Sequence, residues 1–239
     1  MPQVSVIDFN RAIIEATSDL VCAYKPNLAF YESLGADGLE ALKKTVEAVP
    51  PDIVIIGDAK RSDIGHSAAA YATGLFDYFG FDAATVNPYL GHDGVAPFLG
   101  YRDKGIFILC RTSNAGAADF QDLPIAGGEA LFLRVARKAG EWNTHGNGGL
   151  VVGATYPEEL RQVRELCPRM PILIPGVGAQ GGDLEQAVRY GVDARGEQAI
   201  INSSRQVLYA SRDTDFAQAA HRVALGIRDE INRYREPGA

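Results

Sequence analysis

Short apolar runs alternate with amphipathic stretches along the whole chain. The runs contain many β-branched residues and are bounded by glycine, proline or polar residues, which is typical of buried strands. They occupy residues 20–23, 53–56, 83–86, 106–110, 150–152, 172–174 and 199–201. Helical patterns occupy residues 9–18, 38–49, 67–79, 95–101, 129–142, 157–166, 183–190 and 215–235. Strands that alternate with helices in this way predict βαβ units and a parallel sheet.

Polar or glycine-rich residues follow every predicted strand. They occupy residues 25–27, 58–63, 87–89, 111–114, 153–155, 176–182 and 202–205. An open sheet concentrates its chemistry at one switch point, whereas a (β/α)8 barrel collects it on the loops after all its strands. The pattern therefore predicts an α/β protein with a (β/α)8 TIM barrel. Since no change of composition divides the chain, we expect residues 1–239 to form one domain.

Composition and charge narrow the classes of function. Hydrophobic residues make up 46% of the chain and charged residues 22%, which is ordinary for a globular protein. The formal net charge of −7 argues against a surface for nucleic acid or an anionic membrane. Cys22, Cys110 and Cys167 are widely spaced, and Cys22 and Cys110 lie in or beside apolar runs, so we expect buried thiols in a reducing compartment. With neither a membrane-span pattern nor a signal-peptide pattern, we expect a cytoplasmic protein.

A cluster of charged residues follows the strand predicted at residues 53–56. Side chains two apart on a strand share a face, so Asp58 and Lys60 are expected to point the same way, with Asp63 where the chain leaves the strand. Such charges are costly to desolvate unless they compensate one another. Taken alone, the motif also fits a solvated ion pair at a strand end. Lys25, which follows the first predicted strand, is either a surface lysine or a further member of this cluster.

The loop at residues 175–183 has the features of an anion site. Its four glycines allow backbone N–H groups to turn inward, and a helix begins directly after it. Barrels often bind phosphate on the loops after strands seven and eight, and Arg205 follows one βα unit later. These features together favour a phosphate site over a flexible connection with Asp183 as an ordinary helix cap.

Other chemistries are less well supported by the residue pattern. His66, His92, His145 and His221 do not have the spacing of metal ligands, so we predict no metal site. The serines lack the nucleophile motif of acyl-enzyme chemistry.

The motif Asp58-Ala59-Lys60-Arg61-Ser62-Asp63 resembles the D-x-K-x-x-D signature of the orotidine 5'-monophosphate (OMP) decarboxylases. Five further strings resemble the bacterial and archaeal subgroup with longer loops, at residues 9–14 (FNRAII), 23–27 (AYKPN), 85–91 (TVNPYLG), 110–114 (CRTSN) and 174–183 (IPGVGAQGGD). The resemblance implies a TIM-barrel homodimer that converts OMP to UMP, the last step of de novo pyrimidine nucleotide synthesis, without a metal or organic cofactor.

The resemblance also implies roles for individual residues. Lys60 would deliver a proton to C6 of the pyrimidine, with Lys25 and Asp58 completing the charged array. Asp63 would reach the site of the neighbouring subunit. The substrate contacts that the resemblance implies are Ile64 and Ser67 beside that interface, Ser113 at the pyrimidine, and Gln180 and Arg205 at the phosphate.

The chain departs from the family pattern at its start. We expect the family's first strand, which ends in an aspartate, to be missing or replaced in this chain, because the helical pattern begins almost at once. Asp8 is expected to cap that helix. We expect either residues upstream of Met1 to supply the strand or residues 4–7 to form a makeshift one, and we favour the first.

Two alternative functions stay open. Related barrels decarboxylate or condense sugar phosphates with Mg²⁺, but Lys25 stands at a strand end where a carboxylate ligand would be needed. The other alternative is an inactive pyrimidine-nucleotide binding protein. The intact set of Asp58, Lys60 and Asp63 argues against it, because a protein that only binds has no need of that array.

Overall fold

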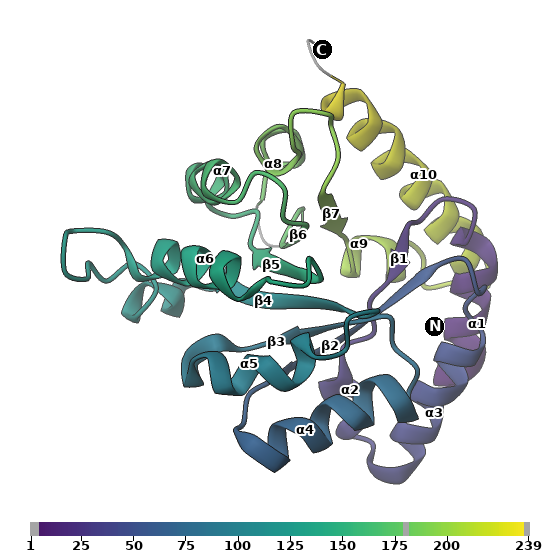
Figure 1. Cartoon of the computed structure of the whole chain (residues 1–239). Helices are drawn as coiled ribbons and strands as arrows, with labels where there is room; N and C mark the ends of the chain where they lie inside the picture. Colours follow the sequence, from purple (N-terminus) through teal and green to yellow (C-terminus); the bar gives the residue numbers. More distant parts are fainter. Residues whose placement is uncertain (1–4, 179–181, 237–239) are drawn as a thin grey trace.

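Seven parallel strands form one curled sheet in the computed structural model, which describes residues 5–178 and 182–236. The strands pair in chain order, from β1 to β7. They are β1 (Ala23–Tyr24), β2 (Val54–Arg61), β3 (Ala83–Val86), β4 (Gly105–Arg111), β5 (Gly148–Val152), β6 (Ile172–Pro175) and β7 (Ala199–Asn202). The sheet curls into an incomplete barrel whose two end strands are β1 and β7 (Figure 1). The predicted barrel fold with a missing strand is confirmed.

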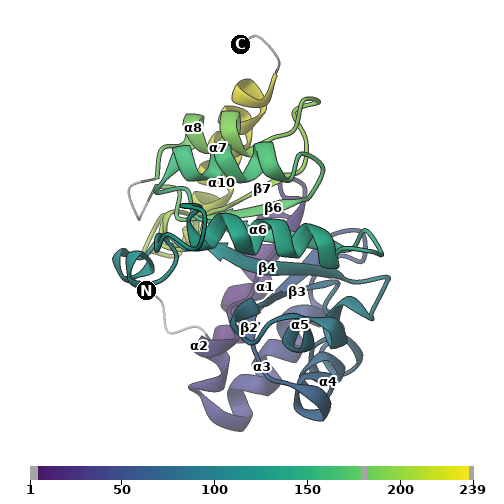
Figure 2. The same ribbon diagram turned by 60° about the vertical axis from the view of Figure 1, so that its left-hand side comes forward.

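Helices lie around the outside of the sheet, broadly in chain order (Figures 1 and 2). They are α1 (Val6–Thr17), α2 (Leu28–Glu32), α3 (Gly35–Glu47), α4 (Gly65–Thr73), α5 (His92–Leu99), α6 (Leu131–Trp142), α7 (Pro157–Leu166), α8 (Leu184–Gly191), α9 (Arg205–Leu208) and α10 (Phe216–Arg235). Gly74–Tyr78 extends α4 as a π-helical turn, and Pro88–Leu90 and Ala115–Asp119 form 3₁₀ turns.

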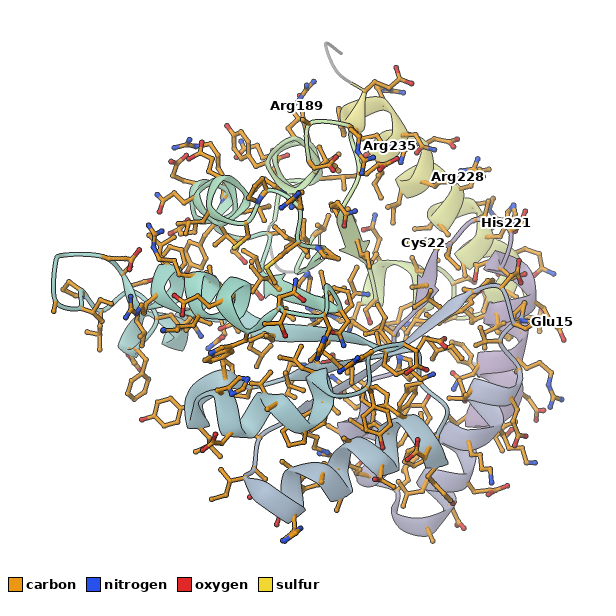
Figure 3. The ribbon with its side chains drawn as sticks, in the orientation of Figure 1. Glu15, Cys22, Arg189, His221, Arg228 and Arg235 are labelled. Atoms are coloured by element: carbon orange, nitrogen blue, oxygen red, sulfur yellow. The ribbon has the colours of Figure 1, made fainter. Side chains whose placement is uncertain are left out.

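The first and last helices pack together and close the helical ring. The rings of Phe9 and Phe216 stack with their centroids 5.1 Å apart. The Nδ1 atom of His221 lies 2.7 Å from the carbonyl oxygen of Ala16, and Figure 3 shows His221 on the side of α10 that meets α1. The helices therefore meet across the gap between the end strands, although β1 and β7 do not pair.

Side chains on the two faces of the sheet form two separate apolar clusters. The larger cluster lies between the sheet and the helices. The smaller one takes residues from every strand on the concave face, two of them from β4, namely Ala23, Ile56, Ala83, Phe107, Leu109, Val151, Leu173 and Ile200. Such a layer of interior side chains fills a barrel rather than leaving a pore. The polar residues of the strand ends lie directly above this apolar layer.

The beginning of the chain differs from the sequence-based prediction. Val6 already belongs to α1, so the makeshift strand at residues 4–7 is wrong; the expectation of an upstream strand stays a prediction. Ser5, not Asp8, is the N-cap of α1, because the Ser5 hydroxyl accepts the Asp8 N–H. The first strand lies at Ala23–Tyr24 instead of residues 20–23, because Leu20 still forms a turn with Thr17.

Two further features are the exposure of the cysteines and the length of the helices. Cys22 is exposed beside β1 (Figure 3), contrary to the prediction. Cys110 is buried, as predicted. No helix within residues 5–178 and 182–236 is long and apolar enough to cross a membrane.

Candidate active site

The polar residues at the strand ends form a second layer above the interior apolar residues. Side chains two apart on a strand share a face, so Lys25, Asp58 and Thr85 stand above the apolar residues two positions earlier in their strands. Since all strands are parallel, their C-terminal ends meet at one edge of the sheet. The structure thus gathers the loops after the strands at one end of the barrel.

Asp58 is the centre of this layer. Its side chain is only 7% exposed, and both carboxylate oxygens have partners. Lys25 Nζ lies 2.6 Å from Oδ2, and Lys60 Nζ contacts Oδ1. Asn27 Nδ2 donates to Oδ2 at 3.3 Å, and the Thr85 hydroxyl donates to Oδ1 at 3.1 Å. The predicted cluster of Lys25, Asp58 and Lys60 is therefore present.

The electrostatics of this cluster follow from burial and pairing. Burial alone would raise the pKa of Asp58, but the ammonium groups of Lys25 and Lys60 outweigh it and hold the pKa below the ordinary value. Burial lowers the pKa of Lys25, and the Asp58 carboxylate opposes that effect only in part. The Lys60 side chain is 46% exposed, against 12% for Lys25. One ammonium is thus buried against the carboxylate, while the other contacts it from a half-exposed side chain.

Lys60 reaches Asp58 through an irregular backbone. Gly57 pairs with Ala84 and Arg61 pairs with Val86, so residues 58–60 oppose only Thr85 on β3. Within this bulge Lys60 has a φ of +49°. A left-handed conformation costs a residue with a Cβ roughly 1–2 kcal/mol, and such strain is concentrated at functional sites. The shared face of Asp58 and Lys60 is confirmed, but it arises from a bulge rather than from regular strand alternation.

Asp63, Ile64 and Ser67 lie apart from this cluster. Asp63 Oδ1 accepts the backbone N–H of Ile64 at 2.8 Å and, among the described residues, forms no ion pair. Ile64 is exposed at the start of α4, and Ser67 is exposed in its first turn. Within the described part of the chain, Asp63 therefore forms no ion pair with Lys60.

The loop after β4 holds Ser113. Buried Arg111 anchors this loop by donating to the carbonyl of Thr112 at 2.9 Å, and its guanidinium lies 4.1 Å from the ring centre of Tyr156. The side chain of Gln121 accepts the Thr112 N–H at 2.8 Å. Gly153, after β5, packs so closely that a Cβ there would lie 2.8 Å from the Cβ of Ser113. Contacts within the loop after β4 and with the loop after β5 thus hold Ser113 in position.

The predicted phosphate loop is compact where it is described. Gly176 and Gly178 have φ values of +97° and +73°, which side chains disfavour. A Cβ on Gly178 would lie 2.8 Å from Oε1 of Gln206, so this loop touches α9, which begins with Arg205. Asp183 caps α8 as the alternative interpretation foresaw, because its side chain accepts the N–H of Gln186. Gln180 lies outside the described residues.

Metal ligands do not gather at the strand ends in the described part of the chain. Among the residues that the structure describes, no group of three His, Cys, Asp or Glu side chains is placed to hold a metal ion. The position beside Asp58 that a second carboxylate would need is occupied by the ammonium of Lys25.

Three residues of the site were not singled out as site residues from the sequence. Asn27 and Thr85 bind Asp58 directly, and Gln121 holds the loop that carries Ser113. A weak signal exists for Thr85, since it is the one polar residue in the strand at 83–86 and lies at its C-terminal end. Gln121 has no comparable signal, because it lies in no regular pattern in the connection between β4 and α6.

Comparisons with known proteins agree with this geometry. The sequence model of the orotidine 5'-phosphate decarboxylase / HUMPS family matches residues 5–222. The chain belongs to this family. The orotidine 5'-phosphate decarboxylase of Herpetosiphon aurantiacus is 56% identical over 92% of this chain and 81% of its own length. That of Thermomicrobium roseum is 53% identical over 97% of this chain and 83% of its own.

A solved structure of the orotidine 5'-phosphate decarboxylase / HUMPS family has the same fold. The OMP decarboxylase of Leishmania donovani superposes with a TM-score of 0.86 at 41% identity, covering 96% of this chain and 87% of that one. Family membership, which the sequence motifs predicted, is confirmed. The relatives are named as decarboxylases, which are carbon–carbon lyases.

Proposed function

We propose that the protein decarboxylates orotidine 5'-monophosphate to UMP, the last step of de novo pyrimidine nucleotide synthesis. The observation that carries this proposal is the buried Asp58 carboxylate held between Lys25 and Lys60 at the open end of a barrel of this family. A binding protein has no need to bury such an array. An enzyme that creates negative charge on its substrate needs fixed charges of this kind to stabilise the transition state.

Lys60 is the proton donor in this reaction. The bond between C6 and the carboxylate breaks, the electron pair stays on C6, and CO₂ leaves. The Lys60 ammonium transfers one proton to C6, and the neutral amine regains a proton from solvent. A fixed ammonium stabilises the developing carbanion more strongly than the ground state, which lowers the barrier. Half-exposed Lys60 suits this role better than buried Lys25, because it reaches towards the open end of the barrel.

Asp58 and Lys25 set the electrostatics around that proton transfer. Because the pKa of Asp58 lies below its ordinary value, the carboxylate stays charged at neutral pH and keeps Lys60 in place. We place the substrate carboxylate near Asp58. Departure of CO₂ relieves the repulsion between the two carboxylates, while Lys25 limits the cost of burying Asp58.

The remaining contacts hold the nucleotide. We assign Ser113 to the pyrimidine, and Gln180 and Arg205 to the phosphate. Support comes from the anchored loop after β4 and from the contact between the glycine-rich loop and α9. Binding energy from a phosphate remote from C6 then serves the chemical step.

The active form is proposed to be a homodimer. Ile64 and Ser67 are exposed after β2, whereas Asp63 is half-buried there and forms no ion pair within the described part of its own chain. We propose that Asp63 completes the site of the partner subunit, with Ile64 and Ser67 contacting the nucleotide beside it. A two-fold axis gives each subunit the same contribution.

No metal takes part in the proposed mechanism. Mg²⁺ prefers several oxygen ligands. At the strand end where such ligands would be needed, Lys25 instead places an ammonium, which cannot bind a cation. This separates the proposal from its alternative, a Mg²⁺-dependent enzyme that acts on sugar phosphates.

Incubation with orotidine 5'-monophosphate tests the proposed function. We expect the absorbance of the orotate ring to fall with stoichiometric release of CO₂, and we expect exhaustive chelation to leave the rate unchanged. Sugar phosphates with Mg²⁺ serve as the comparison substrates. If turnover appears only with metal and a sugar phosphate, the proposal is wrong.

A further inference from the structure

Thr85 joins the two ends of the irregular segment of β2. Its hydroxyl donates to Oδ1 of Asp58 at 3.1 Å and accepts the backbone N–H of Lys60 at 3.0 Å. The side chain is 1% exposed and stands on the concave face of β3. One hydroxyl therefore contacts both the carboxylate at the centre of the site and the backbone of the residue that we propose as the proton donor.

The bulge explains why this contact is needed. Three residues of β2 oppose one residue of β3, so the regular ladder of backbone hydrogen bonds is interrupted there. The N–H of Lys60, in its left-handed conformation, then finds its acceptor in the Thr85 side chain. A buried N–H without an acceptor is unfavourable, so the Thr85 oxygen supports the left-handed conformation.

We infer that Thr85 is a positioning residue of the reaction, whose hydroxyl fixes the Lys60 backbone and the Asp58 carboxylate relative to each other. Its effect on the reacting atoms is indirect, through Lys60 and Asp58. Catalysis by a positioned donor depends steeply on geometry, so loosening this hydrogen-bonded bridge slows the chemical step more than it weakens nucleotide binding.

The inference rests on the proposed function, but its test has a readout of its own. Thr85→Val keeps the shape of the side chain and removes the hydroxyl. We expect kcat for orotidine 5'-monophosphate to fall roughly 10- to 100-fold, with KM changed by less than about threefold, since hydrogen bonds to charged groups are of this strength. In a crystal structure of the variant, we expect Lys60 to leave its left-handed conformation or its Nζ to move away from Asp58.

Two variants separate positioning from general stability. Thr85→Ser restores the hydroxyl and is expected to keep kcat within about threefold of the wild type. Thr45 is a matched control, because it is also buried and its hydroxyl also bridges two groups, donating to Ala41 and accepting from Asn10, but on the outer helix α3. Thr45→Val is expected to lower the melting temperature while leaving kcat unchanged.

The outcomes distinguish the inference from the proposed function. If the wild type does not act on orotidine 5'-monophosphate, the proposed function fails, and the Lys60 conformation in Thr85→Val still tests the bridge. If the wild type is active and Thr85→Val folds with unchanged kcat, the inference is overturned. If Thr85→Val does not fold, Thr85→Ala takes its place. If neither variant folds, a crystal structure of the wild type decides. The inference is overturned if Lys60 has a negative φ there, or if the Thr85 hydroxyl does not accept the backbone N–H of Lys60.

Discussion

Asp58 is a buried charge that depends on several partners in the site. Its carboxylate is buried against Lys25 and also binds Lys60, Asn27 and Thr85. Removing one partner of a buried ion pair leaves the other charge uncompensated, which costs about 3–5 kcal/mol. We therefore predict that Asp58→Asn lowers the free energy of unfolding by roughly this amount at neutral pH, besides abolishing turnover.

The stabilisation that ionised Asp58 provides should be lost at low pH. Lys25 and Lys60 hold the folded pKa of Asp58 below the unfolded value of about 3.9. The stabilisation is therefore fully present above about pH 4 and is lost as pH falls through the folded pKa. Urea unfolding of the wild type and of Asp58→Asn from about pH 3 to 8 measures it. A difference that stays constant over the whole range would contradict this account of the pair.

Residue types and spacing predicted the charged cluster of the site, but not the backbone conformation and hydrogen bonds that hold it in position. The strand pattern placed Asp58 and Lys60 on one face, and Lys25 followed the neighbouring strand. The left-handed conformation of Lys60 and its contact with Thr85 were not predictable, because both depend on the register between β2 and β3. Register across a parallel sheet is determined by packing over long sequence distances and leaves no local pattern.

At the scale of elements, the long periodic segments were predictable and the short ones were not. The strands from β2 to β7 and the large helices lie where the hydrophobic pattern placed them, within a few residues, except that β2 continues to Arg61 and includes residues 58–61, which the pattern assigned to the following loop. The first strand was displaced because β1 has only two residues, too few for a periodic signal. The helices α2 and α9 have five and four residues, and no apolar periodicity marks them. Both lie in loops at the catalytic end of the barrel, where function outweighs regular packing.

At the scale of the whole molecule, the exposed surface after β2 is where we expect two subunits to complete each other's sites. If Asp63 acts across the interface, Lys60→Ala and Asp63→Ala are each inactive alone. In a mixed dimer, one site then carries both lesions and the other carries none. Random exchange of subunits is expected to restore about a quarter of the wild-type activity, since half of the dimers are mixed and each has one intact site.

Subunit exchange must be verified independently of activity. Differently tagged subunits that co-purify after mixing provide this check, and each variant mixed with itself is the control. If exchange occurs and activity does not return, Asp63 does not act in the partner's site.

The central claim is that Lys60 is the proton donor, and the Lys60→Ala variant tests it most directly. Lys44 offers a matched control, because its side chain is 45% exposed, close to the 46% of Lys60, and pairs with carboxylates on the outer helix α3. General acids contribute about 10²–10⁴-fold, so we expect kcat of Lys60→Ala to fall at least about 100-fold. UMP binding, measured by calorimetry, should persist, and Lys44→Ala should match the wild type. A folded Lys60→Ala enzyme that keeps more than about a hundredth of the wild-type kcat would contradict the proposed mechanism.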